Sequence, residues 1–147
     1  MGRDLVAYVQ IKEKDGWKMA PLYRNRYLEE GKEFTYIVYR DHGIYEDLRD
    51  AGYVLKEDEQ YEIDKIVYGD DGFEGLNDEP CNWLAIGFGT LKYLAVTANN
   101  DDIDEEYEYN RVEMLNKIVN LVNATLVLTD NDFKPLDEVR LVFYLSY

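Results

Sequence analysis

The alternation of apolar and polar side chains near the start of the chain is the feature that most restricts its fold. Within residues 4–12, the apolar side chains on one side of an extended chain are Leu5, Ala7, Val9 and Ile11. This period of two is typical of a β-strand with one face in the core. Residues 139–147 are rich in β-branched and aromatic side chains and predict another strand. We therefore expect both ends of the chain to enter one sheet.

Turn residues and apolar spacing predict the elements of the first half. Asp15-Gly16 predicts a hairpin whose second strand ends near Pro21. Residues 34–39 predict a third strand. Apolar residues three and four apart predict a helix over residues 44–51, with Gly52 in the left-handed conformation at its end.

The second half is predicted in the same way. Alternation over residues 61–68 favours a strand, and residues 83–88 form a buried segment that leads into a helix capped by Thr90. The strongest helical pattern covers residues 104–123, and residues 126–128 are expected to continue as a strand.

These elements predict one α+β or α/β domain over residues 1–147. A mixed or antiparallel sheet would be packed by two or three helices, with the helix at 104–123 lying across it. A chain of 147 residues buries roughly 68–70% of its extended surface on folding, which is enough for one hydrophobic core. The single cysteine excludes an internal disulfide and suits a reducing cytoplasm.

The acidic residues are concentrated in the middle of the chain. Residues 57–109 contain sixteen acidic residues against two lysines, a net charge of −14, whereas the whole chain carries −15. Tyrosines lie among these acids. We predict that residues 57–79 and 101–108 form a partner-binding surface. Its candidate residues are Glu57, Asp58, Glu59, Tyr61, Glu62, Tyr68, Asp70, Asp71, Asp101, Asp102, Asp104, Glu105 and Tyr107.

Serine, cysteine and histidine, the residues that most nucleophilic enzymes use, are scarce, whereas carboxylates are abundant. The one serine, Ser146, lies next to the end of the chain, and the one histidine and one cysteine, His42 and Cys81, show no catalytic spacing. The acidic runs do not follow the ligand spacing of an EF-hand, and the glycines lack a phosphate-binding motif. We therefore predict no catalytic residue, no metal site and no cofactor.

The charge also restricts the partners. An acidic segment repels the phosphates that a nucleic-acid-binding protein must neutralise, so we expect no direct contact with nucleic acid. No apolar run approaches the roughly 18 residues of a membrane helix, so we expect no membrane partner. A basic protein surface is the partner that the charge favours, and a homodimer remains an alternative.

Several short segments occur in the order found in small proteins of bacteriophages and prophages. They are Gly2-Arg3-Asp4-Leu5-Val6, the Asp-Gly-Trp turn at 15–17, Tyr39-Arg40-Asp41, Trp83-Leu84 and Val139-Arg140-Leu141-Val142-Phe143. The chain resembles this family over most of its length, although Cys81-Asn82 stands where a His-Ser pair is expected. The resemblance implies a phage-derived protein of the bacterial host cytoplasm and assigns no residue a role.

The sequence thus favours a stoichiometric inhibitor of a host nucleic-acid enzyme, such as a restriction or CRISPR effector. A dense acidic surface can imitate a phosphate array and speed association with a basic channel, while exposed tyrosine rings can stack where bases would lie. Two alternatives remain open. One is a small hydrolase that uses carboxylates and Mg²⁺, and the other is a structural or oligomerisation module that uses the C-terminal strand as a free edge.

Overall fold

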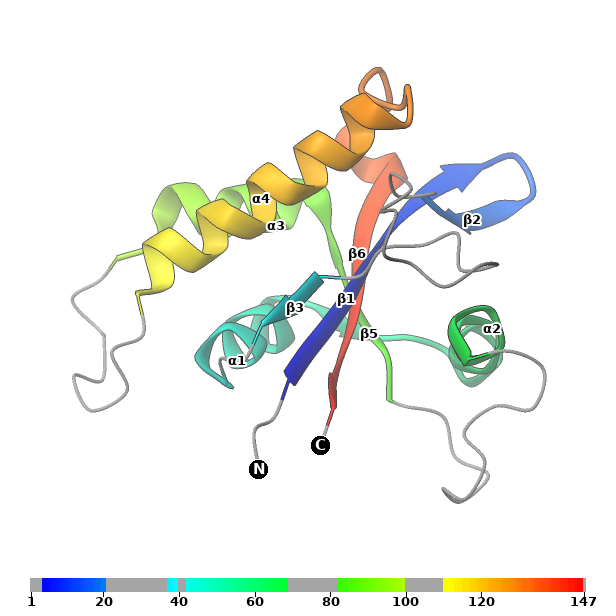
Figure 1. Ribbon diagram of the computed structural model, residues 1–147, viewed down its shortest axis with the longest axis horizontal. Helices are drawn as coiled ribbons and strands as arrows, with labels where there is room; N and C mark the ends of the chain where they lie inside the picture. Colours follow the sequence, from blue (N-terminus) through cyan, green and yellow to red (C-terminus); the bar gives the residue numbers. More distant parts are fainter. Residues whose placement is uncertain (1–3, 21–36, 40–41, 69–81, 100–109, 147) are drawn as a thin grey trace, which may run out of the picture.

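The computed structural model describes residues 4–20, 37–39, 42–68, 82–99 and 110–146. They form a six-stranded sheet and four α-helices (Figure 1). The strands are β1 (Asp4–Glu13), β2 (Gly16–Met19), β3 (Ile37–Tyr39), β4 (Tyr53–Val54), β5 (Leu84–Gly87) and β6 (Val139–Ser146). The helices are α1 (His42–Ala51), α2 (Glu57–Tyr68), α3 (Phe88–Thr97) and α4 (Arg111–Leu128), with a short 3₁₀ turn η3 (Leu136–Glu138) before β6.

Every strand pairing is antiparallel, and the order across the sheet is β2-β1-β6-β5-β4. β3 pairs with the first half of β1, on residues Leu5–Ala7, while β2 pairs with its second half. β1 and β6 therefore lie side by side within the sheet. The prediction that both ends of the chain enter one sheet is confirmed. The structure confirms a single α+β domain with an antiparallel sheet, and its described residues form four helices where two or three were expected.

β6 is an inner strand. It pairs with β1 along its whole length and with β5 over Arg140–Phe143. The expectation that the C-terminal strand offers a free edge is therefore wrong over these residues, because both of its sides are already hydrogen-bonded.

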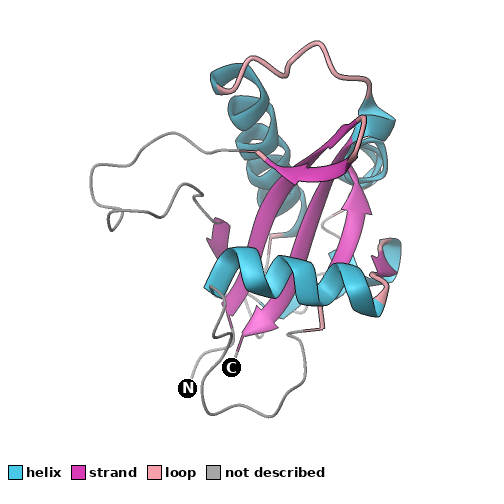
Figure 2. Cartoon of the chain, turned by 90° about the vertical axis from the view of Figure 1, so that its right-hand side faces the viewer, coloured by secondary structure: helices cyan, strands magenta, loops and turns pink. Residues whose placement is uncertain are grey.

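The helices divide unequally between the two faces of the sheet. α1, α3 and α4 cover one face and enclose the larger core, whereas α2 lies alone on the other (Figure 1). Figure 2, viewed from that second side, shows α2 crossing in front of the strands. We call these the three-helix face and the α2 face. The alternation within β1 and β6 assigns each side chain to one of them.

Two glycines occupy positions that a larger residue would not fit, one in a turn and one where two backbone segments lie close together. Gly16, at the β1–β2 turn, has a φ of 123°, a backbone conformation that residues with a side chain rarely adopt. Gly52 does not have the left-handed φ that the sequence suggested. Instead, a Cβ there would lie 2.5 Å from the carbonyl oxygen of Ala85, so a glycine is needed because α1 ends against the backbone of β5.

Three other local predictions are corrected. Residues 126–128 continue α4 rather than forming a strand, and α3 begins at Phe88 after Gly87, which leaves Thr90 inside the helix. Residues 57–68 form α2 rather than a strand. The start predicted for the long helix, residues 104–109, lies outside the described residues, and its described part begins after the cap residue Asn110.

Candidate functional site

α2 is the part of the predicted acidic surface whose structure is described in most detail. Three acidic residues, Glu57, Asp58 and Glu59, occupy its first turn. Carboxylates there are stabilised by the positive end of the helix dipole, typically by about 0.3–1 kcal/mol each. The alternation over residues 61–68 that suggested a strand is misleading, since the buried side chains of this segment follow the helical period instead.

The outer face of α2 points to solvent. We define it by Glu57, Asp58, Tyr61 and Glu62, all of which are exposed, Tyr61 by 45%. Four predicted partner-binding residues thus lie on one turn and a half of one helix. Of the other candidates, Tyr68 ends α2 and Glu59 faces the sheet. Those outside the described residues are Asp70, Asp71, Asp101, Asp102, Asp104, Glu105 and Tyr107.

The inner face of α2 is held by a buried arginine that the sequence analysis did not single out. Nη2 of Arg140 donates a hydrogen bond to Oε2 of Glu59 at 3.1 Å. The arginine side chain is only 5% exposed, whereas that of Glu59 is 33% exposed. Glu59 therefore reaches inward to a buried cation near the start of β6.

The rest of the guanidinium group is also occupied. Its Nε donates to Oε1 of Gln10 at 2.9 Å, and its Nη1 donates to the hydroxyl oxygen of Tyr53 at 3.1 Å. The ring of Trp17 lies against it, with the guanidinium carbon 4.3 Å from the ring centroid. Such stacking is favourable for a desolvated guanidinium. These contacts fix Arg140 in one orientation, so that it positions Glu59.

A second set of hydrogen bonds joins α2 to the segment that enters β5. The indole N–H of Trp83 donates to Oδ1 of Asp64 at 2.8 Å, and the backbone N–H of Trp83 donates to Oε1 of Gln60 at 3.1 Å. Nε2 of Gln60 in turn donates to the carbonyl oxygen of Leu55 at 2.9 Å. Trp83 is fully buried and packs edge-on against Tyr144, 4.5 Å between ring centroids.

Apolar contacts complete the attachment of α2. Ile63, 2% exposed, is its one fully buried apolar side chain among the described residues, and Val67 packs beside it. They belong to the smaller core of the α2 face. Its other members are Tyr8, Met19, Leu55, Trp83, Ala85, Val142 and Tyr144, with Val6 against them. The helix is thus held by three polar side chains, Glu59, Gln60 and Asp64, together with Ile63.

A signal for the Arg140 cluster was present in the sequence. Gln10 and Arg140 interrupt two otherwise apolar strands, and the structure places them directly opposite each other in the β1–β6 register. Polar residues at the centre of apolar strands need partners when buried. The alternation alone could not indicate that Tyr53, Glu59 and Trp17 supply them.

The described residues contain no group of three or more side chains that could hold a metal ion. Within the same residues, no helix is long and apolar enough to span a membrane. Chemically, α2 offers carboxylates and a phenol ring to an external partner while its opposite side is immobilised. Comparisons with protein-family models, with curated proteins and with solved structures find no match to this chain.

Proposed function

We propose that this protein is a stoichiometric inhibitor that binds the basic nucleic-acid channel of a host enzyme, and that the outer face of α2 is part of the surface it uses. The observation that carries the proposal is the two-sided character of α2. Its outer face presents three exposed carboxylates and Tyr61, and its inner face is fixed to the sheet through Arg140 and Trp83.

A helix fixed to the sheet suits this role better than a mobile segment. Binding orders side chains at a cost of about 0.5–1.5 kcal/mol for each rotamer-rich residue, so a support that is already rigid loses less free energy. The net charge of −14 over residues 57–109 adds long-range attraction to a basic surface. Exposed Tyr61 lies between Asp58 and Glu62 on the helix and can stack against a partner's arginine or aromatic side chain.

The resemblance to phage and prophage proteins supports the same proposal, because it implies a protein that acts in the cytoplasm of a bacterial host. Restriction and CRISPR effectors are the nucleic-acid enzymes that such a protein would meet there. The proposed mechanism is occupation of the channel, without chemistry on the target.

The test begins with capture of partners from bacterial lysate on the immobilised chain, followed by titration of the captured enzyme's activity. We expect a nucleic-acid enzyme whose activity falls to zero near a 1:1 ratio, with affinity that drops steeply between low and physiological salt. The double substitution Asp58→Asn with Glu62→Gln should weaken binding by about tenfold or more.

A matched control removes the same charge elsewhere. Glu46→Gln with Asp132→Asn neutralises two exposed acids, one on α1 and one in the turn after α4, and should leave binding nearly unchanged. Equal effects of the two double variants would mean that only the total charge matters. Capture of no nucleic-acid enzyme, or inhibition that ignores salt, would contradict the proposal.

A further inference from the structure

α4 differs from the rest of this acidic chain in having almost no charge along its second half. Residues 118–128 contain no charged side chain, although 32% of the whole chain is charged. Earlier in the helix, Glu113 and Lys117 neutralise each other through an ion pair of 3.1 Å. The absence of charge is not explained by burial, because only one side of α4 faces the core.

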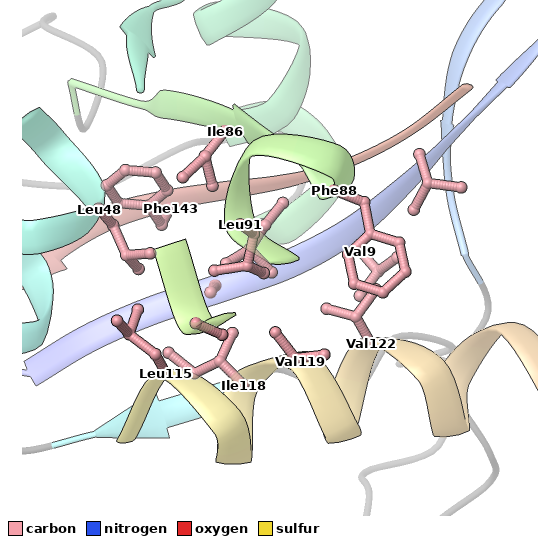
Figure 3. Close-up of a cluster of buried hydrophobic side chains, with 14 of the residues drawn as sticks. Val9, Leu48, Ile86, Phe88, Leu91, Leu115, Ile118, Val119, Val122 and Phe143 are labelled. Carbon is pink, nitrogen blue, oxygen red and sulfur yellow. The ribbon is translucent and has the colours of Figure 1, made fainter. Parts of the chain in front are cut away.

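The inward side is occupied by side chains that fill the three-helix face. Leu115, Ile118, Val119 and Val122 point from α4 into this core (Figure 3). Phe88 and Leu91 of α3 meet them there. Thr125 and Leu126 are buried on the same side of the helix.

The side of α4 that points away from the core is apolar as well. Leu121 is 41% exposed, Val127 60% and Leu128 59%, and Ala124 lies exposed between them. Leu121, Ala124 and Leu128 are spaced by three and four residues, the spacing of a helix-pairing seam. An exposed apolar stripe of this kind often marks a surface that contacts another protein.

Asparagines flank this apolar stripe. Asn120 and Asn123 are exposed near the middle of the helix, where residues with better helix propensity, such as Glu, Lys or Ala, would stabilise it more. An asparagine amide carries both donors and an acceptor, so it can pair with the same side chain of an identical helix. We call Asn120, Leu121, Asn123, Ala124, Val127 and Leu128 the α4 outer face.

The charge distribution indicates what covers this face. Two chains of −15 repel each other, and a contact between copies is least unfavourable where charge is absent. The α4 outer face meets this condition. It also lies on the opposite side of the sheet from α2, so pairing through α4 keeps the two acidic α2 helices on the outside of the assembly.

We propose that the α4 outer face pairs with the same face of a second copy of this chain, around a twofold axis. Such an interface is self-complementary, as a twofold contact requires. The α4 outer face covers residues 120–128, about 13 Å of helix, so the contact is small for a specific interface and we expect a weak, reversible dimer. The pairing leaves the α2 outer face of both copies open.

Sedimentation velocity on the full chain over a wide range of micromolar concentrations tests this pairing. We expect a reversible monomer–dimer equilibrium. It should shift toward the dimer at about 1 M NaCl, where the Debye length is only about 3 Å and repulsion between the chains is screened. Partner binding through α2 should respond to salt in the opposite direction, which separates the two surfaces.

Val127→Lys is the decisive variant. It places a charge in the α4 outer face while lowering the net repulsion, and lysine favours the helix, particularly near its C-terminal end. We expect the dimer to weaken by about tenfold or more, since two lysines would then be buried against an apolar surface. Ala124→Lys should also weaken the dimer, and it too keeps a residue of high helix propensity at its position.

Val54→Lys is the matched control. Val54 is 69% exposed on the edge strand β4, and the substitution changes the charge by the same amount. This variant should dimerise as well as or slightly better than the unmodified chain. A chain that stays monomeric at every concentration and salt, or a dimer that Val127→Lys and Ala124→Lys leave intact, would overturn the proposal. Loss of the dimer in Val54→Lys alone would place the contact at the sheet edge and overturn it too.

Discussion

The two faces of the sheet use the same strands but attach their helices by different means. On the three-helix face, side chains from α1, α3 and α4 interlock with those of the strands in one apolar core. On the α2 face, a single helix is attached by Ile63, Val67 and side-chain hydrogen bonds to Arg140 and Trp83. Apolar burial supplies most of the stability in a domain, whereas buried hydrogen bonds fix orientation. We infer that the three-helix face determines whether the chain folds and that the α2 face determines how α2 is presented.

The largest effect should come from the three-helix face. Phe143 is fully buried at the centre of β6 and packs against Tyr45 of α1, 6.1 Å between ring centroids. Phe143→Ala should lower the free energy of unfolding by about 3–5 kcal/mol, because it removes apolar contacts and leaves a cavity. Urea denaturation followed by circular dichroism measures this loss.

Ile63→Ala is the corresponding change on the α2 face. Ile63 is almost as buried as Phe143 but has a smaller side chain, so we expect a loss of about 2 kcal/mol. Hydrogen exchange should show the loss of protection confined to α2 for Ile63→Ala and spread over the domain for Phe143→Ala. A spread that is equal in the two variants would mean that both faces unfold as one unit.

The same contrast explains which elements the sequence could predict. The strands at both ends were predictable because alternate side chains of β1 and of β6 belong to different cores, one on each face of the sheet. α2 was predicted wrongly as a strand. Its inward positions, Gln60, Ile63 and Asp64 among them, are mostly polar, and polar residues that find partners only in the folded chain do not mark a helix face in the sequence.

The end of α4 was missed for a different reason. Leu126–Leu128 has the composition of a strand, but tertiary packing keeps it helical, and Asp130 ends the helix with a φ of 57°. The backbone N–H groups of Asp130 and Asn131 then bond to the carbonyls of Val127 and Leu126. This hydrogen-bond pattern is common at the C-terminal end of a helix, where the left-handed residue is usually a glycine. Because an aspartate occupies the position here, the sequence gives only a weak indication of where the helix ends.

For the candidate site, the sequence predicted the exposed acids of α2 but not their support. The carboxylates could be recognised by their clustering alone. Arg140 and Glu59 are separated by 81 positions in the chain, and nothing local links them. Buried polar clusters of this kind depend on the packing of distant elements, so they emerge only from the structure.

A double-mutant cycle on Arg140 and Glu59 should give effects close in size to that of Ile63→Ala. Arg140→Met and Glu59→Gln each leave a group on the α2 face without its ionic partner, and we expect losses of about 2–3 kcal/mol for each. The double variant should lose less than the sum, with a coupling energy of about 1–3 kcal/mol. Urea denaturation of the four proteins measures it.

The exposed pair Glu113–Lys117 is the matched control. Its nitrogen–oxygen distance is also 3.1 Å, but both side chains are more than half exposed. Glu113→Gln with Lys117→Met should give a coupling energy of only about 0.3–0.5 kcal/mol. If the two cycles gave equal coupling, burial of Arg140 would have no special importance for α2.

The smallest effect should come from the Asp64–Trp83 hydrogen bond. Asp64→Ala removes the acceptor of a buried indole N–H and should cost about 1–2 kcal/mol, whereas Asp64→Asn keeps an amide oxygen that can still accept and should cost less than about 1 kcal/mol. With Trp17→Phe as background, which keeps an aromatic ring at the position that packs against Arg140, Trp83 is the single tryptophan, so tryptophan fluorescence reports its surroundings. Acrylamide should quench Trp83 more readily after Asp64→Ala, because the end of α2 loosens over a fully buried ring. If Asp64→Ala left the quenching unchanged and Arg140→Met increased it, the contacts of Arg140 alone would hold the helix against the sheet.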